Sequence, residues 1–162
     1  MADIPLESFY EVVLTRVTGP DGQEQEVVFR RGGPVDVLGF QALCAKVGWA
    51  VRPLPKLRAA LANSYLVASL TLESLDRRAR PRLVGLARAT SDGVFNATLW
   101  DVVVDPDFQG QGLGRALVRM CTQILLRLEI ANITLFADAH TVPFYRDLGF
   151  QTSPGGIQGM FW

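Results

Sequence analysis

A strand, a glycine-rich turn, a helix and a second strand follow one another between residues 100 and 137. The first strand is apolar and ends at Val104, and three glycines follow within a few residues. From Leu113 apolar residues recur at helical spacing, and residues 132–137 return to a strand pattern. A helical connection between two strands of one sheet requires those strands to run parallel. This segment therefore predicts a parallel pair of strands.

The rest of the chain has the patterns of an antiparallel sheet with short helices. Strands are expected at residues 11–18, 26–30, 65–72, 83–90 and 97–104, and helices at residues 36–47, 55–63, 113–128 and 142–148. Residues 76–81 predict a solvated loop, with a basic docking site as the alternative, and residues 150–162 predict one or two short strands with a turn at Gly155-Gly156. We expect one domain, residues 1–162, of α+β class, with the parallel pair near the middle of a mostly antiparallel sheet.

Composition excludes several classes of protein. Of 162 residues, 49% are hydrophobic and 20% are charged, which is typical of a globular domain. The formal net charge is zero, so neither nucleic acid nor an anionic membrane is an expected partner. No apolar run is long enough to span a membrane, and the first residues lack the pattern of a signal peptide. Cys44 and Cys121 have no metal-ligand spacing, so we expect buried, reduced thiols and no metal.

The turn Gln109-Gly110-Gln111-Gly112-Leu113-Gly114 has the chemistry of an anion site. Glycines allow the backbone to approach a ligand closely, and the first N–H groups of the helix have no intrahelical partner. Those N–H groups and the helix dipole favour a phosphate. Arg115 adds a cation in the first helical turn, where the dipole alone does not favour one.

The glycine spacing separates the possible nucleotide sites. A P-loop requires Lys and then Ser or Thr after its last glycine, whereas Arg115 and Ala116 follow here, so that site is excluded. A dinucleotide fingerprint requires G-x-G-x-x-G and an acidic residue about 20 positions later, and neither is present. A glycine-rich turn without a ligand stays open at this point.

Two motifs resemble those of the GNAT acetyltransferases. Residues 102–114 are similar to the acetyl-CoA motif of that family, an apolar strand, Pro106 and then Q/R-x-x-G-x-G. Residues 144–150 resemble the F-Y-x-x-x-G-F segment of the same family, in the expected order and separation. Further segments, including residues 43–49, 63–68, 87–92 and 132–138, are similar to a plastid and cyanobacterial branch. That branch includes the plant serotonin N-acetyltransferases and chloroplast protein acetyltransferases.

The resemblance implies the GNAT fold, in which the parallel pair splays at the cofactor site, and it implies acetyl-CoA without a metal. It makes Tyr145 the general acid, with Asp101, Asn132 and Asp138 as further catalytic residues, and Trp100, Asp101 and Asp138 as contacts of the substrate. The implied cofactor contacts are Val102, Val103, Val104, Gln109, Gly110, Gln111, Gly112, Leu113, Gly114, Arg115, Asn132, Asp138 and Tyr145.

For three of these residues a purely structural role is the alternative. Tyr145 and Trp100 fit equally into a core, and Asp138 has the position of an N-cap for the helix at residues 142–148. Asp101 is the one charged residue of its strand segment, and its burial would be costly without a partner.

The function that the resemblance implies is transfer of an acetyl group from acetyl-CoA to a primary amine, foremost an arylalkylamine such as serotonin or tryptamine. Acetylation of protein N-termini or lysines is the alternative, and a non-catalytic acetyl-CoA-binding protein is a lesser one. The expected partners are small-molecule or protein amines, in a chloroplast, with the transit peptide absent from this chain, or in a cyanobacterial cytoplasm. The apolar residues 160–162 are expected to pack within the domain or against a second copy in a homodimer.

Overall fold

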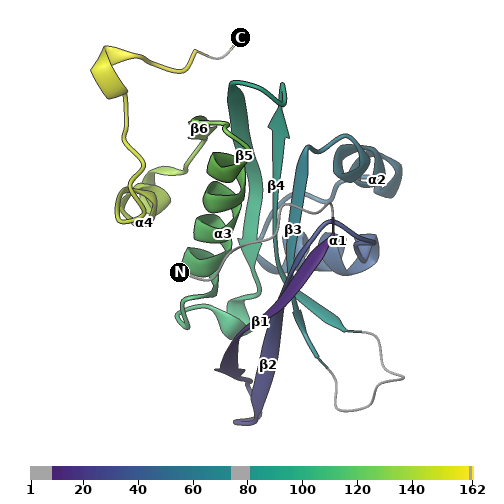
Figure 1. Ribbon diagram of the computed structural model, residues 1–162. Helices are drawn as coiled ribbons and strands as arrows, with labels where there is room; N and C mark the ends of the chain where they lie inside the picture. Colours follow the sequence, from purple (N-terminus) through teal and green to yellow (C-terminus); the bar gives the residue numbers. More distant parts are fainter. Residues whose placement is uncertain (1–8, 74–80, 161) are drawn as a thin grey trace.

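A computed structural model describes residues 9–73, 81–160 and 162 of the chain (Figure 1). Over these residues six strands form one sheet in the order β1-β2-β3-β4-β5-β6. The strands are β1 (Tyr10–Thr18), β2 (Glu24–Arg31), β3 (Leu66–Leu72), β4 (Arg82–Ser91), β5 (Asn96–Val104) and β6 (Asn132–Leu135). The helices are α1 (Val37–Lys46), α2 (Leu54–Ala62), α3 (Leu113–Arg127) and α4 (Val142–Arg146), with 3-10 turns at Pro106–Phe108, Ala139–Thr141 and Pro154–Gly156.

The first five strands form an antiparallel meander, as the sequence predicts. The turn between β1 and β2 contains Gly22 at a φ of 78°, a conformation that glycine adopts without strain. The turn between β4 and β5 is closed by Asp92, whose carboxylate accepts the N–H groups of Val94, Phe95 and Asn96. These hydrogen bonds lower the pKa of Asp92, so its carboxylate remains charged and the turn remains closed at neutral pH.

The parallel pair is confirmed, but its position in the sheet is not the expected one. β5 and β6 run parallel, and β6 is the edge strand instead of lying near the middle. The expected strands of residues 150–162 do not form over the described part of that segment, which instead contains a 3-10 turn. Ser153, Gly155 and Gly156 all have positive φ, and this run of left-handed residues interrupts an extended strand. The expected loop at residues 76–81 lies, except for Pro81, outside the described residues.

The helices cover the two faces of the sheet (Figure 1). On one face α3 packs its apolar stripe, including Leu117, Cys121 and Ile124, against the strands. On the opposite face α1 and α2 pack through Phe40 and Leu57 against β4 and β5. The domain is therefore a sheet between two layers of helices, with one apolar core on each side.

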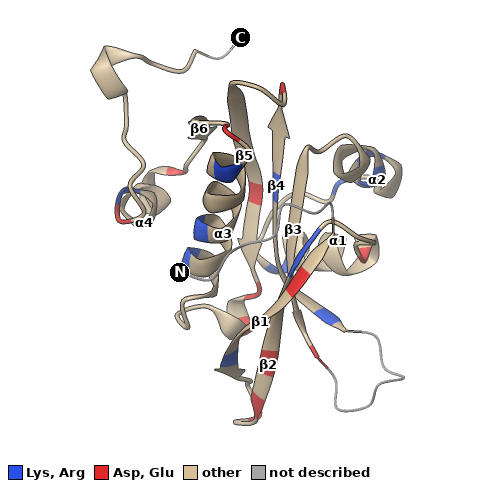
Figure 2. Ribbon diagram, in the orientation of Figure 1, with Lys and Arg blue, Asp and Glu red and all other residues tan. Residues whose placement is uncertain are grey.

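Surface charge and cysteine burial agree with the composition. Figure 2 shows charges of both signs on the strands, whereas the charged bands on α3 are all basic, from Arg115, Arg119 and Arg127. Cys44 and Cys121 are both buried free thiols, and burial raises the pKa of Cys44 and that of Cys121, the latter to about 12. Across the described ranges, no helix combines the length and the apolar character needed to cross a membrane.

Candidate active site

The strands β5 and β6 part before β5 ends. Their pairing runs from Asn96 and Asn132 to Leu99 and Leu135, where β6 stops. β5 continues to Val104, so over its last residues the edge that faced β6 has no strand beside it. A cleft lies at this divergence, lined by Trp49, Arg52, Leu99, Trp100, Asp101, Val102, Leu135, Phe136, Asp138, Thr141 and Tyr145.

A bulge in β5 places Asp101 in the wall of this cleft. The register of β4 and β5 shifts between Leu86 and Arg88, so two residues of β5 oppose one of β4. Asp101 has a φ of 51°, in the left-handed region that aspartate tolerates better than most residues. The carboxylate of Asp101 is only 7% exposed, and accepts from Arg88 Nε at 2.5 Å and from Arg52 at 2.8 Å.

The two arginines explain why a carboxylate is stable in this buried position. Each oxygen of Asp101 accepts a charge-assisted hydrogen bond, which compensates the loss of hydration. The geometry therefore favours a structural role of Asp101 in shaping the cleft over the expected catalytic one.

Asp138 and Tyr145, two further residues that line the cleft, come from the segment that follows β6. Asp138 precedes the 3-10 turn Ala139–Thr141, and its side chain makes no capping hydrogen bond there. The N-cap of α4 is Thr141, so Asp138 does not have the N-cap role that was its structural alternative. The Tyr145 ring packs edge-on against Phe144 and Phe150, with centroids 5.0 and 6.0 Å away. Burial raises the pKa of the Tyr145 phenol, and the charge of Asp138 raises it further. The phenol is therefore protonated at neutral pH.

Aromatic residues form the remaining walls of the cleft. The rings of Trp100 and Phe136 lie 5.4 Å apart between centroids, and the Trp100 indole N–H donates to Thr90 Oγ1 at 2.9 Å. In the same cleft, the Arg52 guanidinium lies over the Trp49 ring, 5.8 Å from its centroid. Sequence reasoning assigned no site role to Trp49, Arg52 or Phe136, because these residues reach the cleft only through the tertiary fold.

The glycine-rich turn lies between the end of β5 and the start of α3. Gly112 is the N-cap of α3 with a φ of 83°, and no side chain caps this helix. A Cβ added at Gly110 or Gly112 would meet no protein atom within 4 Å, so the space above both glycines is open. The N–H groups of Leu113, Gly114 and Arg115 occupy the first helical turn and have no intrahelical acceptor. This geometry suits a phosphate-sized anion.

The polar side chains of the turn contact the protein itself. Gln109 donates its side-chain amide to the Val104 carbonyl at 2.9 Å. Gln111 accepts from the Thr18 N–H at 2.8 Å and donates to the Thr18 carbonyl at 3.0 Å. Arg115 lies 3.5 Å from Asp147. In this arrangement the backbone of the turn, instead of its glutamine side chains, faces the open space.

The structure does not bring Asn132 to the cleft. Asn132 is the first residue of β6, at the end of the parallel pair opposite to the divergence. Its side-chain amide donates to Asn96 Oδ1 at 2.6 Å and holds the start of the two strands together. Val103 and Val104, by contrast, are buried, and only their backbone is available at the strand edge. Among the described residues, no group of three or more His, Cys, Asp or Glu is arranged to hold a metal ion.

Comparisons with known proteins give the family of this domain. The sequence pattern described as "Acetyltransferase (GNAT) family" matches residues 41–150. The chain is 55% identical to "Histone acetyltransferase TAP1" of Glycine max, over 94% of this chain and 68% of that protein. It is 51% identical to "GCN5-related N-acetyltransferase 2, chloroplastic" of Arabidopsis thaliana, over 88% and 60%. It is 42% identical to "Serotonin N-acetyltransferase 2, chloroplastic" of Oryza sativa, over 83% and 65%.

The chain therefore spans about three fifths to two thirds of the length of these relatives. Among solved structures, a GNAT family acetyltransferase from Streptococcus pneumoniae superposes with a TM-score of 0.67 at 25% identity. That match covers 84% of this chain and 96% of the other.

Proposed function

Because the chain belongs to the GNAT acetyltransferase family, we propose that it transfers the acetyl group of acetyl-CoA to the primary amine of an arylalkylamine such as serotonin or tryptamine. The family match supports acetyl transfer itself. The acceptor is inferred from the cleft, in which an exposed carboxylate, Asp138, and a protonated phenol, Tyr145, lie among aromatic residues. This combination is the observation that carries the proposal.

The residues around the divergence fit acetyl-CoA. The open space above Gly110 and Gly112, with the uncapped start of α3, accommodates a pyrophosphate. The edge of β5 from Trp100 to Val103, before the Val104 carbonyl that Gln109 occupies, offers backbone N–H and C=O groups to the amide-bearing pantetheine arm, as a sheet edge does to an added strand. The thioester would then lie in the cleft near Tyr145.

The chemistry of acetyl transfer assigns a task to each group. Acetyl-CoA supplies an acetyl carbon that an amine attacks and a thiolate that leaves. An alkyl ammonium, with a pKa of about 10.4, must lose a proton before it attacks. Asp138 binds the ammonium and accepts this proton through water. A backbone N–H of β5 polarises the carbonyl, and Tyr145 donates its phenolic proton to the departing sulfur. The proton that the attacking nitrogen releases as the amide forms then restores the phenol through solvent.

The aromatic walls favour an acceptor with an aromatic ring. An indole bound in this cleft would gain apolar and ring contacts from its aromatic lining, which includes Trp49 and Trp100, while its ethylamine could pair with Asp138. Aromatic pairs contribute about 0.5–1.5 kcal/mol beyond buried area, which is enough to rank aromatic above aliphatic amines.

A protein amine is the second candidate. The observation that favours it is the name of the relative with 55% identity, "Histone acetyltransferase TAP1". In this reading a protein N-terminus or a lysine side chain enters the same cleft. The compartment that we propose is a chloroplast or a cyanobacterial cytoplasm, supported by relatives whose names are chloroplastic.

Thiol release from acetyl-CoA tests these proposals with a panel of acceptors: serotonin, tryptamine, an aliphatic amine of similar length, a lysine peptide and peptides with free N-termini. We expect the aromatic amines to give the highest kcat/KM. Higher values with a peptide would transfer the assignment to the protein-amine candidate. Absence of release with every acceptor, while acetyl-CoA still binds, would overturn catalysis and leave the non-catalytic binding protein.

A further inference from the structure

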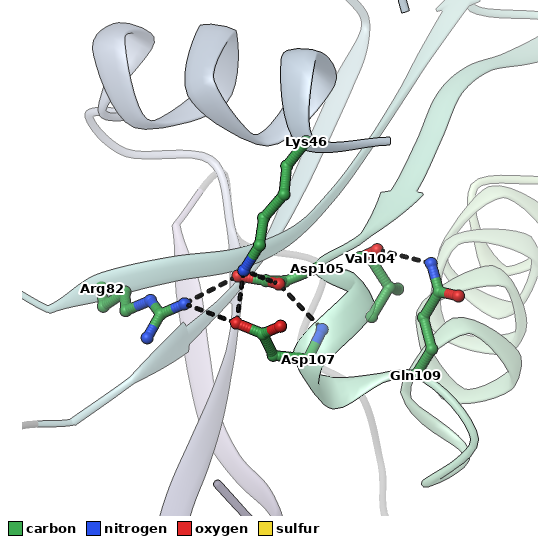
Figure 3. A network of polar contacts seen from close by, with 6 residues as sticks. All are labelled: Lys46, Arg82, Val104, Asp105, Asp107 and Gln109. Atoms are coloured by element: carbon green, nitrogen blue, oxygen red, sulfur yellow. Dashed lines mark hydrogen bonds and ion pairs between the residues drawn. The ribbon is translucent and has the colours of Figure 1, made fainter. Parts of the chain in front are cut away.

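A network of charged side chains lies just before the glycine-rich turn (Figure 3). Its centre is Asp105, the residue after β5, whose side chain is 4% exposed. One oxygen of Asp105 accepts from Lys46 Nζ at 2.5 Å and from the Asp107 N–H at 3.0 Å. The other accepts from Arg82 at 2.8 Å. Lys46 also donates to the Asp107 carboxylate, so it joins two carboxylates of the same turn.

Asp105 is held in its charged form by these contacts. Burial alone would raise the pKa of Asp105, but the hydrogen bonds from Lys46, Asp107 and Arg82 outweigh burial and lower it. The hydrogen bonds that Lys46 donates to Asp105 and Asp107 in turn raise the pKa of Lys46. At neutral pH the network is therefore a set of opposite charges, in which Asp105 is the buried member that requires its partners.

The network determines the path of the chain from β5 into the glycine-rich turn. The Asp105 N–H donates to the Val84 carbonyl at 2.8 Å, and its own carbonyl accepts from the Phe108 N–H at 2.9 Å. Phe108 is buried in the core, with Arg82 stacked over its ring at 5.3 Å. Gln109 then bonds back to Val104. Each residue from the end of β5 to the first glycine thus has a fixed neighbour.

The other end of the network is anchored on α1. Lys46 is the last residue of this helix, which packs on the sheet through buried Phe40, Leu43 and Cys44. The helix begins at the N-cap Asp36, whose carboxylate accepts the Gly39 N–H. Lys46 therefore connects the well-packed helix α1 to residues 105–107, which lead into the glycine-rich turn.

We propose that Lys46 and Asp105 are positioning residues for acetyl-CoA: they fix the turn whose backbone binds the pyrophosphate, without touching the cofactor. This inference rests on the proposed acetyl-CoA site. A turn that is fixed before binding loses less conformational entropy when the ligand binds. Loss of the Lys46 contacts should therefore weaken cofactor binding and leave the acceptor site unaltered.

The test compares Lys46→Met, Lys46→Arg and Lys56→Met. Lys56 is exposed on α2 and is the only other lysine of the chain, so its variant controls for loss of one lysine charge. Equilibrium binding of CoA by calorimetry is the primary measurement, and it requires no turnover. We expect Lys46→Met to raise the Kd of CoA about tenfold, or about 1.4 kcal/mol. Lys46→Arg should restore most of the affinity, since a guanidinium also bridges two carboxylates. Lys56→Met should match the wild type.

Kinetics separate positioning from a general loss of structure. For Lys46→Met the KM of acetyl-CoA should rise, while the KM of the amine and kcat at saturating acetyl-CoA stay at wild-type values. Asp105→Asn, which keeps the shape but removes the charge, should raise the Kd of CoA in the same way. Unchanged CoA affinity in both variants, or equal increases of both KM values, would overturn the positioning role. Failure of the wild type itself to bind CoA would instead overturn the proposed function.

Discussion

At the scale of single residues, the side chain with the clearest chemical assignment is Tyr145. Its ring packs edge-on against Phe144 and Phe150, and Tyr145 lines the cleft together with Asp138, whose charge acts on the phenol. Phe at this position would pack equally well, so the packing does not explain the hydroxyl. A phenol whose pKa is raised remains protonated and can donate to a thiolate, whose pKa as a thiol is similar.

Replacement of Tyr145 by Phe should therefore lower kcat by about 10²- to 10⁴-fold, as for loss of a general acid, with unchanged Kd for CoA. A general acid loses activity as pH rises through its pKa. The raised pKa places that decrease above the ordinary phenol value of about 10. We expect this alkaline limb of the kcat–pH profile to disappear in Tyr145→Phe. Tyr65→Phe, at an exposed tyrosine outside the cleft, is the control; a kcat equal to wild type for both would remove Tyr145 from the mechanism.

Gly112 permits a test of the proposed pyrophosphate site, because Gly22 has a similar backbone conformation far from it and can serve as a control. Gly112 and Gly22 have φ of 83° and 78°, and an added Cβ at either meets no protein atom within 4 Å. Alanine at either position costs about 1–2 kcal/mol of strain. Only Gly112→Ala places a methyl group where the pyrophosphate is proposed to lie. We expect similar decreases in thermal stability and a higher Kd of CoA for Gly112→Ala alone. Equal CoA affinity of the two variants would contradict the assignment of the turn.

At the scale of elements, the β1–β2 hairpin and the glycine-rich turn act as one unit. Gln111 makes two hydrogen bonds with the backbone of Thr18, 93 residues away, in the manner of a neighbouring strand. The hairpin thereby supports the turn through contacts separate from the Asp105 network. Neither residue has a motif that indicates this contact, and the family resemblance implies a cofactor contact for Gln111 instead.

Gln111→Ala removes both hydrogen bonds, each with a net contribution of about 0.5–1.5 kcal/mol. We expect faster hydrogen exchange at the Thr18 amide and weaker CoA binding, both measured well below the unfolding temperature. Gln111→Glu keeps an acceptor for the Thr18 N–H but places a charge against the Thr18 carbonyl, so it should not restore the wild type. Gln151→Ala, in the exposed tail, serves as control. Wild-type exchange at Thr18 in Gln111→Ala would refute the tether.

Patterns among neighbouring residues predict most of the helices and strands correctly, but they do not predict the contacts between these elements. The meander, the parallel pair and α3 follow from periodicity and glycine positions, which are properties of neighbouring residues. The arginine partners of Asp101 lie 49 and 13 positions away, and sequence spacing does not reveal such pairs. The resemblance placed Asn132 in the site, whereas the strand register puts it at the opposite end of β6.

At the scale of the whole molecule, the C-terminal tail carries exposed apolar side chains beside β6, the edge strand of the described sheet. Phe136, directly after β6, is 54% exposed, and Gly159 of the tail approaches its ring. Ile157 and Met160 are 74% and 95% exposed, and Figure 1 shows the tail extending beyond the sheet. The sequence predicts short strands in residues 150–162. Over the described part of the chain, this tail thus has no sheet partner within one copy.

We expect a second copy of the chain to cover this tail and the β6 edge, which would give a homodimer. A two-fold dimer lets each copy offer the same edge and tail, so that the strand edge and the apolar tail are buried at once. Sedimentation equilibrium should yield twice the chain mass, and the double variant Ile157→Ser, Met160→Ser should shift the equilibrium to monomer. Because both side chains are exposed in one copy, the circular dichroism spectrum should not change.

The control for this dimer is a second exposed apolar pair, Val94 and Phe95, at the turn between β4 and β5. Val94→Ser, Phe95→Ser removes a comparable apolar surface but lies outside the tail, so it should leave the association constant unchanged. Monomers at every concentration of the wild type would refute the dimer. Equal dissociation by the two double variants would attribute association to general hydrophobicity instead of the tail. Dissociation by the tail variant alone, with the acetyl-CoA affinity preserved, would place the interface at the tail and separate assembly from cofactor binding.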